Sequence, residues 1–298
     1  MHFPVLSKEI IDYLDPKPNE NFIDATFGQG GHTLKILERT KPKGKVLAIE
    51  IDPELYEKMR KEIRNKKEWK EKRERLILVN SSFTNLKEIV KREKFENIKG
   101  ILFDLGLSSW HLEESKRGFT FLKNEPLNMR YDGKINELTA KDILNKWSKK
   151  EIERILKEYA QERFAKRISE KIVKERKEKK IETTFQLVQI IKKATPKWYH
   201  FKRIHFATRV FLALRIAVNN ELENLKRGLE QALEILKSGG KIAVISFHSG
   251  EDKIVKNFFK ENKSKLKILT KKPIVPQKEE IVQNLKSRSA KLRVAIKI

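Results

Sequence analysis

The strongest constraint on the fold is a glycine-containing turn between a short apolar segment and an amphipathic one. Residues 24–33 read Asp-Ala-Thr-Phe-Gly-Gln-Gly-Gly-His-Thr. Glycine lets a backbone turn sharply and approach a ligand closely. A helix predicted over 32–39 would point its free N–H groups and positive dipole end at this turn. An adenosine-bearing cofactor is the natural occupant, and these residues alone leave open which one.

The rest of the chain alternates apolar runs with charged amphipathic segments. The runs predict buried strands over 21–26, 44–50, 76–79, 98–104 and 241–247, and a final strand pair over 265–270 and 292–298. Helices are predicted between them, over 32–39, 53–75, 86–94, 207–237 and 253–262. Strands that alternate with helices at this spacing predict a doubly wound, mostly parallel α/β sheet.

The alternation stops in the middle of the chain. There the apolar residues fall at helical spacings of three and four, which predicts helices over 139–147, 149–179 and 184–193. We therefore predict an α/β core formed by residues 1–105 and 207–298, with an all-helical insertion over 106–206.

Charge is the dominant feature of the composition. Lys and Arg number 67 against 41 Asp and Glu, a net charge of +26, which favours a polyanionic partner such as nucleic acid. A generally basic, Lys-rich proteome would give a similar balance, and the Lys/Glu/Ile-rich, Cys-free, Gln-poor composition is typical of thermophile proteins. The absence of cysteine excludes disulfides and thiolate sites, and the spacing of the six histidines predicts no metal site. No segment resembles a signal peptide or membrane span, so we expect a cytoplasmic protein that does not bind membranes.

Ligands of open α/β sheets bind beyond the carboxyl ends of the strands. The predicted strand ends are followed by the glycine turn, Glu50, Phe83, Asp104 and residues 247–252. Glu50 is placed to accept hydrogen bonds from both ribose hydroxyls, of either a nicotinamide dinucleotide or S-adenosylmethionine. The Gly-x-Gly-Gly spacing does not decide between them, and an ordinary tight turn would also produce it.

Longer blocks of residues carry a more specific signal. They are, in order, residues 2–6, 24–32, 104–109, 117–121, 126–130, 162–168, 207–209, 213–216, 218–219, 245–249 and 287–293. In these blocks the chain closely resembles the bacterial small-subunit rRNA cytosine-N4 methyltransferase family, also called MraW or RsmH, nearly end to end. The resemblance implies a class I S-adenosylmethionine-dependent methyltransferase with a Rossmann-like core and a helical substrate-recognition insertion.

The resemblance also implies the reaction and its site. S-adenosylmethionine would be the methyl donor, and the acceptor would be the N4 amine of a decoding-centre cytosine in 16S rRNA of the small (30S) ribosomal subunit. By position, the cofactor contacts fall on Gly28, Gly30, Gly31, His32, Glu50, Phe83, Asp104 and His111. The chain departs from the family at Glu50, usually Asp, at His111, often Gln, and locally over 201–205.

Asp104 is the predicted catalytic residue. The exocyclic amine of cytosine is a poor nucleophile because its lone pair is delocalised into the ring, so transfer needs in-line positioning and an acceptor for the amine hydrogens. The target base must also leave its stack. Trp110, Phe119 and Phe121 are candidate stacking partners, and packing of the insertion would explain the same rings equally well.

Basic residues of three blocks are predicted to contact RNA phosphates. They are Arg163, Lys166, Arg167, Arg209, Arg288, Lys291 and Arg293, and a solvated charged surface is the alternative for the helical ones. Two other functions compete. An NAD(P)-linked oxidoreductase would explain the turn and Glu50 but not the charge or the blocks. A non-catalytic RNA-binding assembly factor would explain the charge but would not require both acids. Naked rRNA and the assembled subunit both suit the charge as substrate, and the oligomeric state stays open.

Overall fold

The structure is a computed structural model that describes residues 4–298, so residues 2 and 3 of the first motif block lie outside the described residues. The chain divides into two compact units. Unit 1 comprises Met1–Gly106 and Leu222–Ile298, and unit 2 comprises Leu107–Glu221. The boundary predicted at residue 206 differs, because helix α11 (Thr208–Asn219) packs against α7 (Lys149–Ala160) of unit 2. Residues 207–221 therefore belong with the helical unit.

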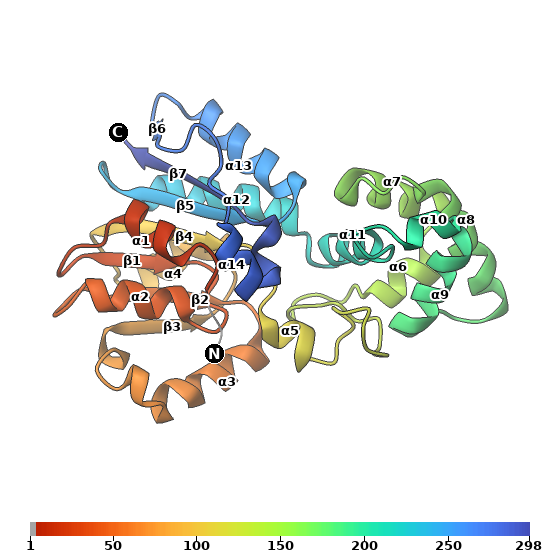
Figure 1. Ribbon diagram of the computed structural model, residues 1–298. Coiled ribbons are helices and arrows are strands. Elements are labelled where there is room, and N and C mark those ends of the chain that lie inside the picture. The colour runs from red at the N-terminus through yellow and green to blue at the C-terminus, as the bar shows by residue number, and fades with distance from the viewer. Residues whose placement is uncertain (1–3) are drawn as a thin grey trace. The chain divides into compact units, whose positions relative to one another are not determined.

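Unit 1 is built on a seven-stranded sheet with the order β3-β2-β1-β4-β5-β7-β6 (Figure 1). The strands are β1 (Asn21–Asp24), β2 (Val46–Glu50), β3 (Leu76–Asn80), β4 (Ile98–Asp104), β5 (Lys241–Ser246), β6 (Leu266–Ile268) and β7 (Lys291–Lys297). Strands β1 to β5 pair in parallel, whereas β7 pairs antiparallel with β5 and β6. The predicted α/β class with a mostly parallel sheet is confirmed.

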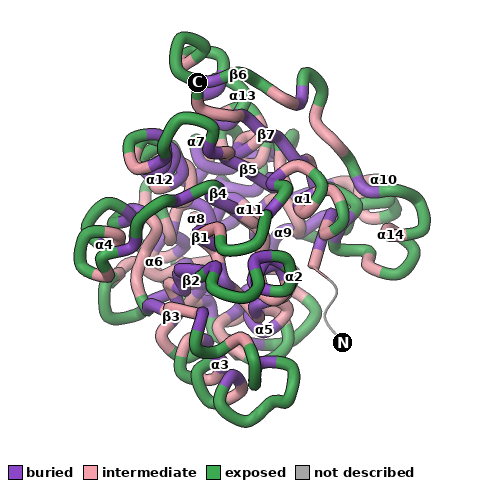
Figure 2. Tube along the Cα trace, turned by 90° about the vertical axis from the view of Figure 1, so that its left-hand side faces the viewer, coloured by how far each residue is buried: buried purple, intermediate pink, exposed green. Residues whose placement is uncertain are grey.

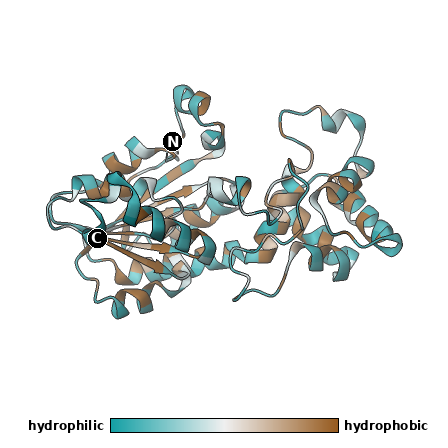
Figure 3. Ribbon diagram, turned by 90° about the horizontal axis from the view of Figure 1, so that it is seen from below, coloured by the Kyte–Doolittle hydropathy of each residue, from teal (hydrophilic) through white to brown (hydrophobic). Residues whose placement is uncertain are grey.

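Helices cover both faces of this sheet. They are α1 (Ser7–Leu14), α2 (Gly31–Arg39), α3 (Pro53–Asn65), α4 (Leu86–Arg92), α12 (Glu221–Ile235), α13 (Ser249–Glu261) and α14 (Lys278–Gln283). Successive strand residues point to opposite faces. Ile23 and Ile101 join a core cluster with residues of α4, α12 and α13, whereas Phe22 and Leu14 of α1 lie against Gly100 on the other face. The inner strands β1, β2, β4, β5 and β7 are accordingly mostly buried and apolar, whereas the edge strands β3 and β6 are more exposed (Figures 2 and 3).

Unit 2 consists of helices and loops around a core of its own. Its helices are α5 (Ser109–Glu113), α6 (Ala140–Lys146), α7, α8 (Ala165–Glu178), α9 (Thr184–Ala194), α10 (Lys197–His200) and α11. Helices α6, α7 and α9 each begin with a capping box, in which an N-cap hydroxyl and the side chain three residues later satisfy each other's backbone N–H groups. The capping boxes fix where these helices start.

Several predicted helices are shorter than expected. The helix predicted over 149–179 is interrupted at Gln161, and the one over 207–237 at Asn220, and both residues adopt left-handed backbone angles with φ near 50°. Neither interruption has a glycine or proline to signal it. Asparagine tolerates the left-handed conformation better than most residues, whereas glutamine does not. The helix predicted over 53–75 ends at Asn65 and continues as two short 3₁₀ turns, Lys67–Trp69 and Arg73–Arg75.

Within residues 4–298, the helices are too short or too polar to cross a bilayer.

Candidate active site

The direction in which the chain winds reverses between two neighbouring strands of the sheet. From β1 the chain continues through β2 to β3 on one side, whereas β4 and β5 lie on the other. The carboxyl ends of β1, β2 and β4 lead into the glycine turn, Glu50 and Asp104 respectively. In open α/β sheets, this reversal opens the crevice where ligands bind. The turn therefore lies between two carboxylates at the edge where a ligand is expected.

Two glycines of the turn have backbone angles that favour glycine, with φ of +55° at Gly28 and +77° at Gly30. A Cβ atom at Gly30 would lie 2.7 Å from the Trp69 ring and 2.8 Å from Phe27. A Cβ atom at Gly28 would meet nothing closer than the Thr26 carbonyl at 4.0 Å. Gly30 is thus packed against an aromatic wall, while Gly28 leaves room for a ligand to approach the backbone. Trp69 was not predicted as a site residue, because it lies in a charged segment without a strand or motif nearby.

Gly31 is the first residue of α2, and a Cβ atom there would lie 3.1 Å from the Pro4 ring. This close approach ties the start of the helix to the N-terminal segment. The predicted glycines therefore hold different places in the turn: Gly28 borders open space, whereas Gly30 and Gly31 are packed from behind.

Glu50 is a buried carboxylate, and each of its oxygens accepts one backbone hydrogen bond. Oε2 accepts from the Gly28 N–H and Oε1 from the Asp52 N–H, both at 2.9 Å. Burial raises the pKa of Glu50 to about 8, against the lowering effect of these two hydrogen bonds. A carboxylate oxygen has room for a second donor, so the two oxygens together can accept from two adjacent hydroxyl groups. That is the geometry a ribose diol requires.

A buried network joins the turn to the ends of β1 and β4. Asp24 Oδ2 accepts from the Thr33 hydroxyl at 2.6 Å, and Asp24 Oδ1 from the Thr26 N–H at 3.2 Å. Thr26 Oγ1 in turn accepts from the Asp104 N–H at 2.6 Å. Burial raises the pKa of Asp24. The network positions the backbone of Asp104 relative to the turn, and these roles of Asp24, Thr26 and Thr33 were not predicted.

Asp104 faces His32 across this network, with 3.5 Å between Asp104 Oδ2 and His32 Nε2. Three buried polar atoms around the turn lack a hydrogen-bond partner among residues 4–298: Asp104 Oδ1, His32 Nε2 and Gln29 Oε1. Buried polar atoms are nearly always paired in folded proteins. A group of unpaired atoms beside a glycine turn fits the site of a polar ligand, and Gln29 joins the predicted residues there.

Phe83 follows β3 at the same edge of the sheet. Its ring makes an edge-to-face contact with Phe103, with 5.5 Å between centroids. A Cβ atom at Gly228 of α12 would lie 2.6 Å from the Phe83 ring, so the ring is closely supported from one side. The side chain is half-buried. It is therefore a rigid apolar surface at the site's margin.

His111 belongs to unit 2, where it lies in a cluster of aromatic rings. Its ring lies 5.3 Å from Trp110, 5.2 Å from Phe119 and 5.1 Å from Tyr131. Phe119 stacks on Tyr131, and Phe121 packs against the same core. The packing alternative therefore accounts for Trp110, Phe119 and Phe121 within unit 2. A cofactor contact for His111 stays a prediction.

The predicted phosphate contacts separate into two groups. Four side chains belong to exposed residues: Arg163, Lys166, Arg167 and Arg288. The other three make internal contacts. Arg209 is half-buried, and its Nη1 donates to the Gln161 carbonyl at 2.8 Å. This hydrogen bond ties α11 to the end of α7.

Arg293 does not fit the predicted role. It lies on β7, is 7% exposed, and donates from Nε to Asp252 Oδ1 at 2.6 Å and from Nη2 to Asp252 Oδ2 at 3.3 Å. Lys291 Nζ lies 3.5 Å from the same carboxylate. A buried, doubly bonded guanidinium is not available to a phosphate, so Arg293 is corrected to a structural ion pair that links β7 to α13.

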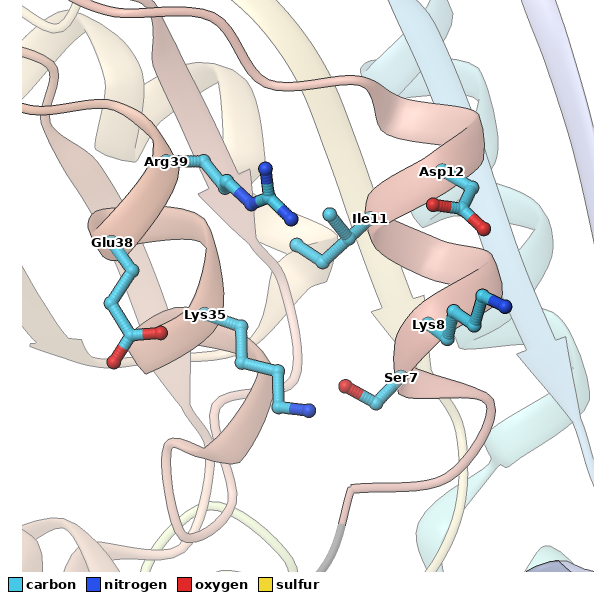
Figure 4. Close-up of a pocket in the computed structure, with 7 residues that line it drawn as sticks. All are labelled: Ser7, Lys8, Ile11, Asp12, Lys35, Glu38 and Arg39. Atoms are coloured by element: carbon cyan, nitrogen blue, oxygen red, sulfur yellow. The ribbon is translucent and has the colours of Figure 1, made fainter.

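A separate groove lies between α1 and α2, with a volume of about 290 Å³ (Figure 4). Ser7, Lys8, Ile11 and Asp12 of α1 line one side, and Lys35, Glu38 and Arg39 of α2 the other. Its cations are nearly balanced by acids, and it holds none of the residues of the site at the strand ends. We assign it no function.

Comparison with known proteins shows the family to which the chain belongs. The family model described as the MraW methylase family matches residues 1–298. The chain belongs to this family. Two relatives named ribosomal RNA small subunit methyltransferase H match all of the chain and 99% of their own length: one from Caldicellulosiruptor saccharolyticus is 45% identical, and one from Persephonella marina 43%. Among solved structures, an rRNA methylase from Streptococcus thermophilus covers 100% of this chain and 99% of its own, with 11% identity and a TM-score of 0.46.

MraW methylases need a methyl donor, and the sheet and its crevice are those of a class I methyltransferase. The cofactor is therefore S-adenosylmethionine. The unpaired atoms of Gln29, His32 and Asp104 and the two-oxygen acceptor of Glu50 fit such a group.

Proposed function

We propose that this protein transfers the methyl group of S-adenosylmethionine to the N4 amine of a decoding-centre cytosine in 16S rRNA. One observation carries the proposal: two carboxylates, the buried Glu50 and the partly buried Asp104, stand at the strand ends on either side of the glycine turn. The names of the relatives support small-subunit rRNA as the substrate, and the net charge of +26 suits RNA. A cytoplasmic protein that acts on the 16S rRNA of the 30S subunit follows from this proposal.

The proposed roles divide between binding and chemistry. Glu50 holds the ribose hydroxyls, and the backbone at Gly28 lies against the methionine end of the cofactor with His32 and Gln29 beside it. When bound, S-adenosylmethionine supplies an electrophilic methyl group on its sulfonium. Phe83 gives the adenosine an apolar contact. These residues bind and orient, and none of them has to change its protonation state during the transfer.

Asp104 orients the acceptor. Its unpaired Oδ1 accepts a hydrogen bond from the cytosine amine, which draws electron density toward nitrogen and directs the lone pair at the methyl group. Transfer would form the N4–methyl bond as the sulfur–methyl bond breaks and S-adenosylhomocysteine leaves, and the proton that N4 loses would pass to the Asp104 carboxylate that accepts its hydrogen bond. Because the amine is weakly nucleophilic, positioning matters more than basicity. The exposed cations Arg163, Lys166, Arg167 and Arg288 would hold the RNA backbone.

The proposal is tested by transfer of a radiolabelled methyl group from S-adenosylmethionine to small-subunit rRNA. The labelled nucleotide is mapped on purified 30S subunits and on naked 16S rRNA from cells that lack the modification. We expect label on one cytosine, released as N4-methylcytidine on digestion. Label on ring carbon or ribose, or label spread over many nucleotides, would refute the assignment. Binding of 16S rRNA without any transfer would favour an assembly factor.

A further inference from the structure

Unit 2 carries a long stretch of chain without any acidic residue. Residues 183–220 contain seven Lys and Arg residues and no Asp or Glu, in a protein in which 36% of residues are charged. The middle of this stretch, residues 197–206, reads Lys-Trp-Tyr-His-Phe-Lys-Arg-Ile-His-Phe. Basic residues interleaved with aromatic rings are typical of surfaces that bind single-stranded nucleic acid.

The rings at this place are exposed. Trp198 is 47% and Phe201 86% accessible to solvent. They are three residues apart in and just after α10, so they lie on the same side of one helical turn. Burying a phenylalanine side chain stabilises a protein by about 1.5–3 kcal/mol. A ring left at 86% exposure contributes little of this to the fold, and it is available to a partner.

Cations surround the tryptophan. The Arg163 guanidinium lies 5.6 Å from the centroid of the Trp198 ring, and the Lys202 ammonium 5.4 Å from it. Arg203 follows in the chain and is exposed. We call Arg163, Trp198, Phe201, Lys202 and Arg203 the aromatic–basic surface. Because these cations lie over the ring, a base would stack on the tryptophan by displacing one of them, and the displaced cation would stay close enough to pair with the phosphate of that nucleotide.

The aromatic–basic surface rests on a rigid base. The Tyr199 hydroxyl donates to Glu162 Oε2 at 2.9 Å, and the other oxygen of Glu162 accepts from the Phe164 N–H at 2.9 Å. Burial and this hydrogen bond raise the pKa of Tyr199 to about 12, so the phenol keeps its proton. Thr195 Oγ1 lies at hydrogen-bond distance, 2.9 Å, from His200 Nε2. Helix α10 is thus held to unit 2 through Tyr199 and His200, whereas Trp198 and Phe201 are exposed to solvent.

We infer that the aromatic–basic surface binds unpaired bases of the rRNA by stacking on Trp198 and Phe201. The inference rests on the proposed function, which supplies RNA as the partner, and adds a recognition site within unit 2. Single-stranded RNA is the occupant that fits, because every base has a face that can stack and because the stretch lacks any acid that would repel phosphate. Double-stranded RNA, whose bases are already stacked, would bind here only through its phosphates.

Trp198 gives a direct measurement. The chain has four tryptophans, and the other three, Trp69, Trp110 and Trp147, are buried or half-buried. A base that stacks on Trp198 should quench the fluorescence of this residue and leave the fluorescence of the other three tryptophans unchanged. We expect the full-length protein to be quenched by an oligouridylate of about a dozen nucleotides, a length within the range one module binds. The variant W198F should lose the quenching and keep most of the affinity.

The matched pair of variants is F201A and F185A. Phe185 is also exposed, at 46%, but it lies on α9 outside the aromatic–basic surface. We expect F201A to weaken oligouridylate binding about tenfold, as loss of one stacked base implies, and F185A to leave it unchanged. Thermal unfolding of both variants should match the parent protein. Equal affinities for the two variants, together with unchanged quenching in W198F, would overturn the inference.

Methyl transfer to 30S subunits separates this inference from the proposed function. If the protein transfers methyl groups normally but the F201A and F185A variants bind RNA with equal affinity, the aromatic–basic surface does not bind RNA and the proposed function still holds. Quenching of Trp198 fluorescence by RNA without methyl transfer to rRNA would support the RNA-binding surface and refute the proposed function. A concentration-dependent dimer that F201A converts to monomer, with unchanged RNA binding, would assign the rings to a second copy of the chain and also overturn the inference.

Discussion

Asp104 is the residue on which the proposed chemistry depends most directly. Its backbone is fixed by Thr26 and its Oδ1 has no partner in residues 4–298, so D104A should leave the fold intact while removing the acceptor for the cytosine amine. We expect kcat to fall about a hundredfold or more at saturating S-adenosylmethionine.

The variant D104N is the control for this prediction. It retains an acceptor oxygen of the same reach, so it should recover part of the lost rate. Full methylation by D104A at saturating cofactor would show that Asp104 does not act on the amine. Calorimetric titration with S-adenosylhomocysteine would separate a loss of binding from a loss of transfer.

Glu50 makes cofactor binding depend on pH. Its pKa is raised to about 8 by burial, so below pH 8 most molecules hold a proton on the carboxyl group that has to accept from the ribose. The proton must leave before the diol binds. We therefore expect the affinity for S-adenosylhomocysteine to rise with pH and level off above about pH 8, by up to about tenfold per pH unit below it. E50Q should bind weakly at every pH.

The same group affects stability with the opposite sign. Its folded-state pKa of about 8 exceeds the ordinary value of 4.5, so the native state binds more protons between these values. The contribution of Glu50 to the free energy of unfolding is complete below pH 4.5 and is lost as the pH rises through 8. Urea unfolding of the ligand-free protein at pH 6 and pH 9 should show the decline, and E50Q should reduce it.

Among the elements, the glycine turn offers a matched comparison. Gly30 and Gly239 have nearly the same φ, +77° and +79°, but a Cβ atom at Gly30 would meet Trp69 and Phe27 within 3 Å, whereas at Gly239 nothing lies within 4 Å. G239A should cost about 1–2 kcal/mol of stability, the price of left-handed backbone alone. G30A adds a collision with two rings, so its loss of stability should be clearly larger and accompanied by loss of cofactor binding. Equal losses of stability in the two variants would mean that the Trp69 and Phe27 rings move aside to accommodate the new Cβ atom.

At the scale of helices and strands, the sequence predicts those features that local residue patterns encode. The predicted strands match all seven strands of the sheet, most clearly the inner ones, because a strand covered on both faces shows its burial in consecutive apolar residues. Helix ends were harder, because Gln161 and Asn220 break their helices in left-handed backbone conformations although neither is glycine or proline. The helices α1, α5, α10 and α14 were not predicted, and three of them are six residues long or shorter.

The site divides in the same way. The glycine turn, Glu50 and Asp104 could be predicted because the carboxyl ends of parallel strands meet at one edge. Trp69 and Asp252 could not, since their roles come from residues distant in the chain: Gly30 packs on the first, and Arg293 is bonded to the second. For the aromatic–basic surface a signal was available, the acid-free run over 183–220, but burial decides which of its rings are exposed.

For the whole molecule, the excess of basic charge should appear as a salt dependence. Each phosphate contact contributes roughly 0.7–0.9 to the slope of log K against log salt concentration. We expect the double variant K166A/R167A, with both changes at exposed residues of α8, to lower the slope for 16S rRNA binding by about 1.5.

The double variant K61A/R64A is matched to it in charge. Lys61 and Arg64 are also exposed, on α3 of unit 1. Removing them should leave the slope nearly unchanged. An equal decrease for both double variants would mean that the charge acts as a diffuse field, and no decrease for K166A/R167A would exclude α8 from the RNA interface.

Two neighbouring strands of the sheet, β4 and β5, are far apart in the sequence, and this separation affects how the protein folds during synthesis. Ile101 of β4 pairs with Ile242 of β5, and all of unit 2 is synthesised between them. At about 5–20 residues per second, a ribosome needs on the order of ten seconds to traverse that stretch. During this time the nascent chain presents one apolar strand edge that nothing yet pairs. Unit 2 is stabilised by local helical contacts, so it can fold before β5 is synthesised and pairs with β4. We therefore expect an intermediate during synthesis in which the edge of β4 is exposed and favours early chaperone binding.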